Sequence, residues 1–266
     1  MRSWRFRATM LEELIGGRKE HTMPDMQTSP QIMTNVVPRR SSSGTLDDAT
    51  ADVTTAESGA SNDVPTVAPS VTSGNFTFTH TGIEGVILVE VKQYADKRGY
   101  FMETYKRTDF EAGGILANFV QDNQSSSTKG VLRGLHFQIA HPQAKLVRVV
   151  RGRVFDVAVD LRRNSATFGK WVGVVLSEEN QRQFFIPRGF AHGFLVLSDA
   201  AEFCYKCDDV YHPGDEGGLM WNDPDIAISW PALDGDASFD EQKAILSKKD
   251  TKHPSLAELI AQQDAK

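Results

Sequence analysis

From Phe76 onward, short runs of β-branched and aromatic residues alternate with turn residues, and this spacing constrains the fold more than any other feature of the chain. In the clearest run, apolar residues occupy every second position from Phe155 to Leu161, after a turn at Arg151-Gly152. A period of two residues places the apolar side chains on one face of a strand. We therefore expect a hairpin that packs against a second sheet, within an all-β sandwich or barrel.

Other runs of the same kind extend this prediction along the chain. Strands are expected at residues 86–91, 100–105, 146–150, 171–176, 183–186, 193–197 and 201–207. Helices should be few and short. Thr108 and Glu111 have the spacing of a capping box and predict a helix that Gly113 ends, and Ser255 with Glu258 predicts another near the C-terminus.

Residues 1–75 differ in composition from the rest of the chain. They are mostly small, polar and aperiodic, as in the stretch from Ser41 to Thr45, and bury too little apolar surface to offset the entropy of ordering. The sequence predicts a disordered extension over 1–75, with a short helix around residues 11–15. A single folded domain is expected over 76–266.

Charge and composition exclude several classes of function. The chain has 266 residues, 40% of them hydrophobic, and a formal net charge of −6, which argues against a general binder of nucleic acid or of anionic membranes. No apolar run is long enough to span a bilayer. The absence of a Gly-x-Gly-x-x-Gly or Walker motif weakens nicotinamide and phosphoryl-transfer hypotheses.

The only two cysteines, Cys204 and Cys207, form a Cys-x-x-Cys pattern. A zinc site would need two further ligands, and a redox motif normally begins a helix. Here the pattern lies in an expected strand, where residues three apart point to opposite faces. We interpret the cysteines as two free thiols in a reducing compartment.

One stretch, from Arg133 to Lys145, concentrates groups that could perform chemistry. It offers an imidazole at His136 and two permanent cations among residues of strand character. An imidazole can take up a proton near neutral pH, and a nearby cation can stabilise the negative charge left behind. Spacing alone leaves two readings open, a catalytic site or an amphipathic hairpin with solvated polar groups.

Six motifs, taken in order, resemble the dTDP-4-dehydrorhamnose 3,5-epimerases. They are Arg98-Gly99-Tyr100-Phe101-Met102-Glu103, Val120-Gln121-Asp122-Asn123, Arg133-Gly134-Leu135-His136, Gln143-Ala144-Lys145, Pro187-Arg188-Gly189-Phe190-Ala191-His192-Gly193-Phe194 and Leu246-Ser247-Lys248-Lys249-Asp250. The resemblance implies a cupin jelly roll and a cytoplasmic homodimeric isomerase without a cofactor. Its implied reaction is the epimerisation of dTDP-4-dehydro-6-deoxyglucose at C3 and C5.

The resemblance also assigns residues to roles. It implies that His136 is the base, that Asp250 orients it, that Lys145 lies near the ketone oxygen and that Tyr205 donates a proton. Contacts to the nucleotide or sugar are implied for Arg98, Phe101, Glu103, Gln121, Asn123, Arg133, His192, Tyr211, Glu216 and Lys249.

Three alternatives accompany these assignments. His192, in Pro-x-Gly-x-x-His, could be a cupin metal ligand, but the His-x-His and Glu that such a site needs are missing, so we expect no metal. The same base, cation and acid could serve a relative that inverts one carbon or acts on another nucleotide 4-ketosugar. A non-catalytic, sugar-binding cupin is the third alternative.

Overall fold

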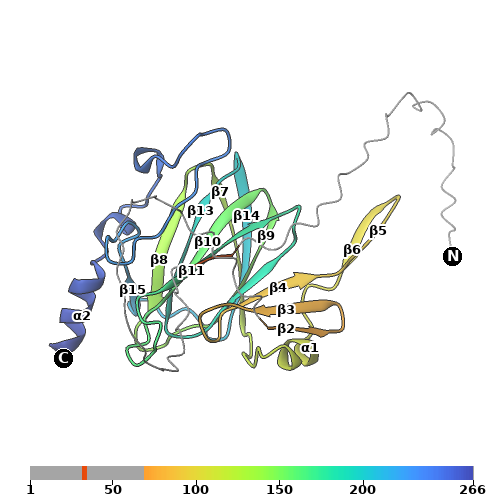
Figure 1. The fold of residues 1–266 in the computed structure, drawn as a ribbon, viewed down its shortest axis with the longest axis horizontal. Helices are drawn as coiled ribbons and strands as arrows, with labels where there is room; N and C mark the ends of the chain where they lie inside the picture. Colours follow the sequence, from red (N-terminus) through yellow and green to blue (C-terminus); the bar gives the residue numbers. More distant parts are fainter. Residues whose placement is uncertain (1–31, 35–68, 266) are drawn as a thin grey trace, which may run out of the picture. The chain divides into compact units, whose positions relative to one another are not determined.

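The computed structural model describes residues 32–34 and 69–265, and β-strands dominate this part of the chain (Figure 1). The strands are β1 (Ile32–Thr34), β2 (Ser70–Ser73), β3 (Phe76–His80), β4 (Ile87–Val91), β5 (Gln93–Asp96), β6 (Gly99–Met102), β7 (Gln121–Thr128), β8 (Leu132–Gln138), β9 (Lys145–Arg151), β10 (Arg153–Asp160), β11 (Trp171–Ser177), β12 (Gln183–Ile186), β13 (Phe190–Val196), β14 (Ala200–Cys207) and β15 (Glu216–Gly218). The helices are α1 (Arg107–Ala112) and α2 (Leu256–Asp264), with 3₁₀ turns η1 (Glu241–Lys243) and η2 (Asp250–Lys252).

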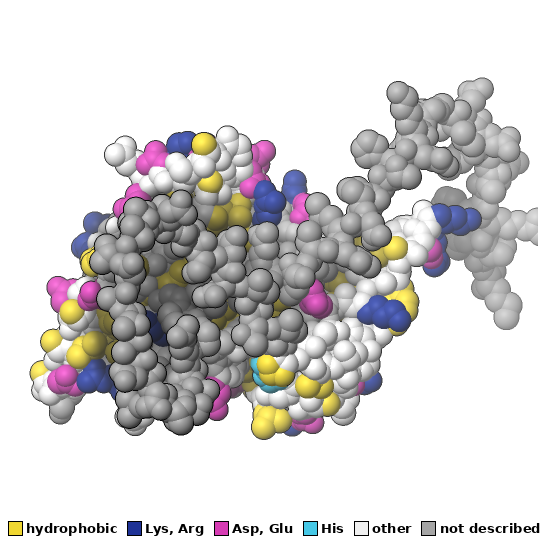
Figure 2. Space-filling model, in the orientation of Figure 1, with side chains coloured by type: hydrophobic (Ala, Val, Ile, Leu, Met, Phe, Trp, Pro, Cys, Tyr) yellow, Lys and Arg dark blue, Asp and Glu magenta, His cyan; other side chains and the backbone are white. Residues whose placement is uncertain are grey.

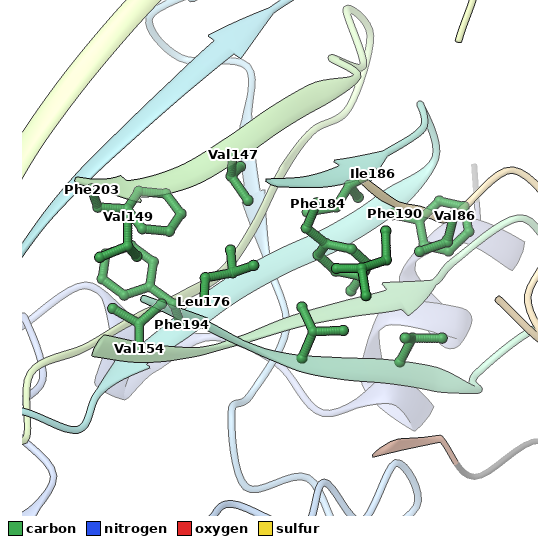
Figure 3. Packing of buried hydrophobic residues seen from close by; sticks show 14 of the residues in the cluster. Val86, Val147, Val149, Val154, Leu176, Phe184, Ile186, Phe190, Phe194 and Phe203 are labelled. Atoms are coloured by element: carbon green, nitrogen blue, oxygen red, sulfur yellow. The ribbon is translucent and has the colours of Figure 1, made fainter. Parts of the chain in front are cut away.

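Two antiparallel sheets form the body of the fold. The six-stranded sheet has the order β1-β11-β10-β13-β8-β15, and the seven-stranded sheet has the order β2-β3-β4-β12-β9-β14-β7. Their inner faces share a core, in which Val147 and Phe184 of the larger sheet lie with Val154 and Phe194 of the smaller one (Figure 3). The predicted all-β sandwich is confirmed.

The strands on either side of Arg151-Gly152 do not form the predicted hairpin. β9 pairs with β12 and β14 in the larger sheet, whereas β10 pairs with β11 and β13 in the smaller one. Gly152 therefore carries the chain from one sheet to the other. It has a φ of +75°, and a Cβ there would lie 1.9 Å from the carbonyl oxygen of Ala200.

Both faces of β10 are buried, although its alternating pattern predicted only one apolar face. Phe155 and Val157 pack against a C-terminal segment that includes Trp230 and Leu256. The opposite face, which carries Asp156, points between the sheets, and Asp156 is completely buried. A carboxylate on this face is thus an interior group and not a solvated one.

Only one of the two predicted capping boxes forms. At α2, the Glu258 amide donates to Oγ of Ser255 (3.2 Å), and the Ser255 amide donates to Oε2 of Glu258 (2.8 Å). At α1, the prediction was wrong, because the helix begins at Arg107 and Thr108 already lies inside it. Its N-cap, Lys106, makes no side-chain capping bond, while Gly113 ends the helix as expected.

Two strands lie within the segment predicted to be disordered. β2 pairs with β3, and β1 pairs with β11. The boundary predicted at residue 76 is therefore too late, because strand pairing uses backbone groups and does not require apolar side chains. The helix expected at residues 11–15 lies outside the described residues. No helix in the described ranges is long and apolar enough to cross a membrane.

A hairpin of β5 and β6 forms its own two-stranded sheet and projects from the sandwich (Figure 1). Charged side chains gather at its tip, where Asp96 and Arg98 form an ion pair (Figure 2). Along the hairpin, the side chains of Tyr100 and Phe101 are 56% and 70% exposed. Both of these large aromatic side chains thus face solvent in the single chain.

Candidate active site

Strand register places polar residues side by side on the inner face of the larger sheet. Cys207 of β14 pairs with Gln121 of β7 on one side and with Lys145 of β9 on the other. Two residues earlier in β14, Tyr205 pairs with Asn123 in the same way. Side chains of paired residues lie on the same face of a sheet. These five groups therefore line one wall of the space between the sheets.

A β-bulge on the smaller sheet turns two functional side chains to the opposite wall. In a regular strand, Arg133 and His136 would point to opposite faces, because they are three residues apart. Here the register with β13 shifts by one residue between them, so both face inward. Gly134, with a φ of +121°, permits this, since a Cβ there would lie 2.6 Å from Cα of Gly193.

The two walls enclose a cleft with two cavities of about 440 and 460 Å³. Both cavities are lined by His136, Lys145, His192 and Tyr205, so they meet at these side chains. Other predicted site residues complete the lining: Gln121, Asn123, Arg133, Tyr211, Glu216, Lys249 and Asp250. The structure thus brings together eleven of the fourteen predicted site residues.

Three predicted site residues, Arg98, Phe101 and Glu103, do not line this cleft. Arg98 and Phe101 belong to the projecting hairpin, and Glu103 directly follows it, where its Oε2 accepts a hydrogen bond from the side chain of Asn75 (3.2 Å). These residues therefore do not contribute to the cleft of their own chain.

His136 and Asp250 form a close pair at the edge of the cleft. Nε2 of His136 lies 2.5 Å from Oδ1 of Asp250, which is 3% exposed. Oγ of Ser247, a residue that our sequence analysis did not single out, donates to the other carboxylate oxygen (2.8 Å). Burial raises the pKa of Asp250, but the bonds from His136 and Ser247 outweigh it, and the pKa is lowered overall. The carboxylate is therefore charged at neutral pH.

Asp156 is a second site residue that the sequence analysis missed. Nε2 of His192 lies 3.0 Å from each carboxylate oxygen of Asp156, and both side chains are buried. His192 is thus anchored to the protein by Asp156 while it lines both cavities. The sequence signal for Asp156 was its position in the middle of an apolar strand. This position indicates a site residue only once that face of β10 is known to point inward.

Lys145 is a half-buried amine that lines both cavities. Burial lowers the pKa of Lys145, and the nearby Asp156 carboxylate counteracts this by favouring the charged amine. Burial also lowers the pKa of His192 and raises that of Asp156. An ammonium group in a site partly removed from water stabilises developing negative charge better than one in bulk water.

Tyr205 lies on the sheet opposite to His136. Burial raises the pKa of Tyr205, so its hydroxyl keeps its proton at neutral pH. Two residues along, burial raises the pKa of Cys207 to about 11, so this thiol also remains neutral. Both cysteines are free, and Cys204 is less buried than Cys207. The phenol is therefore an available proton donor, and the thiol is a weak nucleophile.

The outer rim of the cleft carries an ion pair and an exposed aromatic ring. Lys249 pairs with Glu216 and holds the pKa of that carboxyl below its usual range. Tyr211 is 47% exposed, and its amide donates to Oε1 of Gln121 (2.8 Å). The rim thus offers a cation and a flat ring around the polar interior.

Comparisons with known proteins agree on one family. The family model of dTDP-4-dehydrorhamnose 3,5-epimerase matches residues 80–258. The enzyme of that name from Methanothermobacter thermautotrophicus is 58% identical over 156 residues, 59% of this chain and 84% of that protein. A dTDP-4-dehydrorhamnose 3-epimerase from Streptomyces niveus is 43% identical over 167 residues, covering 62% and 81%.

A solved structure of the same fold contains a ligand. It is a dTDP-6-deoxy-D-glucose-3,5-epimerase from Legionella pneumophila in complex with dTDP-4-keto-L-rhamnose, 48% identical, with a TM-score of 0.65 over 70% of this chain and 96% of that one. With its cupin fold, the chain therefore belongs to the dTDP-4-dehydrorhamnose 3,5-epimerase family.

Proposed function

We propose that the chain is an isomerase that inverts C3 and C5 of dTDP-4-dehydro-6-deoxyglucose, a step towards dTDP-L-rhamnose. One observation carries this proposal: His136 and Tyr205 reach the same cleft from opposite sheets, with the half-buried Lys145 lining both of its cavities. Inversion beside a ketone needs this arrangement of a base, an acid on the other face of the sugar and a cation for the enolate.

The first step is removal of a proton next to the 4-ketone. The imidazole of His136 accepts the proton, and the electron pair of the C–H bond moves onto the ketone oxygen to form an enolate. Asp250 steadies the imidazolium through the 2.5 Å contact. The ammonium of Lys145 stabilises the enolate oxygen. Proton transfer alone accounts for this step, so it needs no redox group.

The second step returns a proton to the opposite face of the carbon. The hydroxyl of Tyr205 donates its proton to the enolate carbon, and the ketone re-forms with inverted configuration. His136 then loses its proton to solvent, and the phenolate of Tyr205 takes one up. Because the acid and the base stand on different sheets, the returning proton arrives from the face opposite to the departing one.

The hairpin of β5 and β6 supports a homodimer as the functional unit. Phe101 is 70% exposed, yet it is one of the residues implied to contact the substrate, as is Arg98. We propose that this hairpin extends over the cleft of a second copy of the chain. The guanidinium of Arg98 would then contact the diphosphate there.

Mixing two inactive variants tests the homodimer. Arg98→Ala removes the contribution of the hairpin, and His136→Ala removes the base. In a mixed dimer, the hairpin of the His136→Ala chain completes the cleft of the Arg98→Ala chain, so activity returns. If the mixture stays as inactive as its components while size-exclusion chromatography shows mixed dimers, the shared site is wrong.

The two free cysteines support a cytoplasmic location. Thiols persist in reducing compartments and tend to form disulfides in oxidising ones. Cys204 and Cys207 are free in the structure. We therefore propose that the reaction takes place in the cytoplasm, and alkylation of the protein in cells lysed directly into denaturant would show both thiols reduced.

Incubation with dTDP-4-dehydro-6-deoxyglucose in deuterated water tests the reaction. Deuterium at both C3 and C5, with inversion at both, is the expected result. The similarity to a 3-epimerase from Streptomyces niveus makes single-carbon inversion the second candidate, and deuterium at one carbon only would favour it. Binding without any exchange would favour a sugar-binding protein instead.

A further inference from the structure

A second imidazole lies behind the His136–Asp250 pair. His253 follows η2, and its Nε2 lies 3.4 Å from Oδ1 of Asp250. Its ring stands edge-on to that of His136, with 5.4 Å between the ring centroids and 78° between the ring planes. One carboxylate oxygen therefore lies close to two imidazole nitrogens.

The nitrogen of His253 that faces this oxygen has no hydrogen-bond partner among the described residues. The side chain is only 9% exposed, so water does not readily replace a partner. A buried polar atom left without a partner costs about 1–3 kcal/mol. The nitrogen is thus an unused ligand atom that points into the cluster.

The position of His253 depends on a glycine in β15. A Cβ at Gly218 would lie 2.0 Å from Nδ1 of His253, so any other residue would displace the ring. Gly218 also pairs with His136 in the strand register. The same short strand thus holds both imidazoles in place.

We propose that His136, Asp250 and His253 form a binding site for a first-row divalent cation such as Zn²⁺, and that its occupation switches off the enzyme. The three ligand atoms lie within 4.8 Å of one another. Two imidazole nitrogens and one carboxylate oxygen are a common donor set for zinc. His136 lines both cavities and is 37% exposed, which leaves a route to a fourth position for water.

The site is compact, and metal binding must open it slightly. Zinc bonds of about 2.0–2.2 Å in a tetrahedral arrangement separate neighbouring ligand atoms by roughly 3–3.5 Å. The contact from Asp250 to His253 already has such a length, at 3.4 Å. The contact from His136 to Asp250, at 2.5 Å, must lengthen as the metal replaces the proton between the two groups.

Metal binding and catalysis exclude each other at His136. A neutral imidazole has one nitrogen lone pair available to a proton or a metal. Once Zn²⁺ holds it, the ring cannot accept a proton from the sugar, and Asp250 is also engaged. The inhibitory half of the proposal rests on the proposed function of His136 as the base, whereas the binding half does not.

Calorimetric titration of the full-length, chelator-treated protein with ZnCl₂ tests binding directly. We expect one Zn²⁺ per chain. His253→Phe keeps a ring beside Gly218 but lacks nitrogen, and His253→Gln is a second variant in case the first does not fold. Each should weaken Zn²⁺ binding by at least about 10-fold, because even loss of an outer-shell partner of a metal ligand typically costs that much. His141→Asn is the matched control, because it removes a half-exposed histidine beside Asp215 elsewhere on the protein.

Activity measured at the same free Zn²⁺ concentrations tests the inhibition. In the wild type, loss of activity should follow the calorimetric occupancy and be reversed by EDTA, and the His253 variants should need at least tenfold more zinc for the same fractional loss. Equal zinc binding by the wild type and the His253 variants, or loss of binding in His141→Asn alone, would overturn the site. Zinc binding with unchanged activity would overturn the inhibition and leave the site standing. If the protein has no epimerase activity at all, the calorimetry still decides whether the site exists.

Discussion

Replacing Asp250 by asparagine tests the role of the carboxylate behind His136. The change keeps the shape of the side chain and removes its charge. In the structure, Oδ1 of Asp250 lies 2.5 Å from Nε2 of His136; the carboxylate is 3% exposed and the imidazole 37%, so solvent screens this interaction only in part. We expect a large loss in turnover and a small change in nucleotide affinity, because the residues that we propose as nucleotide contacts do not include Asp250.

The expected loss has two contributions. A hydrogen bond to a charged group contributes about 1.5–3 kcal/mol and a neutral one about 0.5–1.5 kcal/mol, so loss of the charge lowers stabilisation of the imidazolium by about 1–1.5 kcal/mol, roughly tenfold in rate. The amide can also present its NH₂ group to the ring and select the wrong tautomer. Together these effects should lower kcat by about 10- to 10³-fold, below the roughly 10⁴-fold limit for loss of a general base.

The assay is deuterium exchange into the substrate at saturating concentration, with dTDP binding measured alongside. Ser247→Ala is the matched control. It removes the 2.8 Å bond to the other carboxylate oxygen but keeps the charge, so its kcat should fall by no more than about tenfold. If Asp250→Asn exchanges at the wild-type rate, or if Ser247→Ala is equally slow, the charge of Asp250 is not what assists His136.

Three further predictions concern the fold and the thiol in the cleft. Gly134→Ala places a Cβ 2.6 Å from Cα of Gly193 at a φ of +121°. Chemical denaturation should therefore show a loss of about 1–3 kcal/mol or more in the free energy of unfolding, and kcat should fall. Unchanged values of both would refute the need for glycine in the bulge. Asp160 is fully buried and accepts five hydrogen bonds, which lower its pKa despite burial, so Asp160→Asn should cost about 3–5 kcal/mol of unfolding free energy at pH 7. Because the folded pKa lies below the unfolded value of about 3.9, this difference should be complete above that value and shrink as pH falls through the folded pKa; a difference that does not change with pH would contradict it. Burial raises the pKa of Cys207 to about 11, so iodoacetamide at pH 8 should modify it at least 100-fold more slowly than a peptide cysteine, as mass spectrometry would show; equal rates would contradict the burial.

The sequence predicted the strands well, because the period of two residues is a local property. It did not predict how the strands are shared between the sheets. The turn at Gly152 looks like a hairpin turn locally, and only pairing with distant strands shows that it joins two sheets. The same non-local packing buries Asp156, since a C-terminal segment covers the other face of its strand.

The sequence motifs predicted which residues belong to the site, but not which of these residues contact one another. Asp250 and His136 are separated by 114 residues, and no local pattern indicates that they touch; the family resemblance placed them together. The contacts of Ser247 and His253 depend on the path of the C-terminal segment. The motifs also assigned Arg98 and Phe101 to the site. In the single chain, however, both residues lie outside the cleft.

Tyr205→Phe tests most directly whether the acid and the base lie on opposite walls of the cleft. In deuterated water, His136 in this variant can still remove the proton and return a deuteron to the same face. We expect deuterium exchange at the carbons beside the ketone, with inversion reduced by about 10²-fold or more. Inversion at the wild-type rate in Tyr205→Phe would contradict it, because the donor would then lie elsewhere.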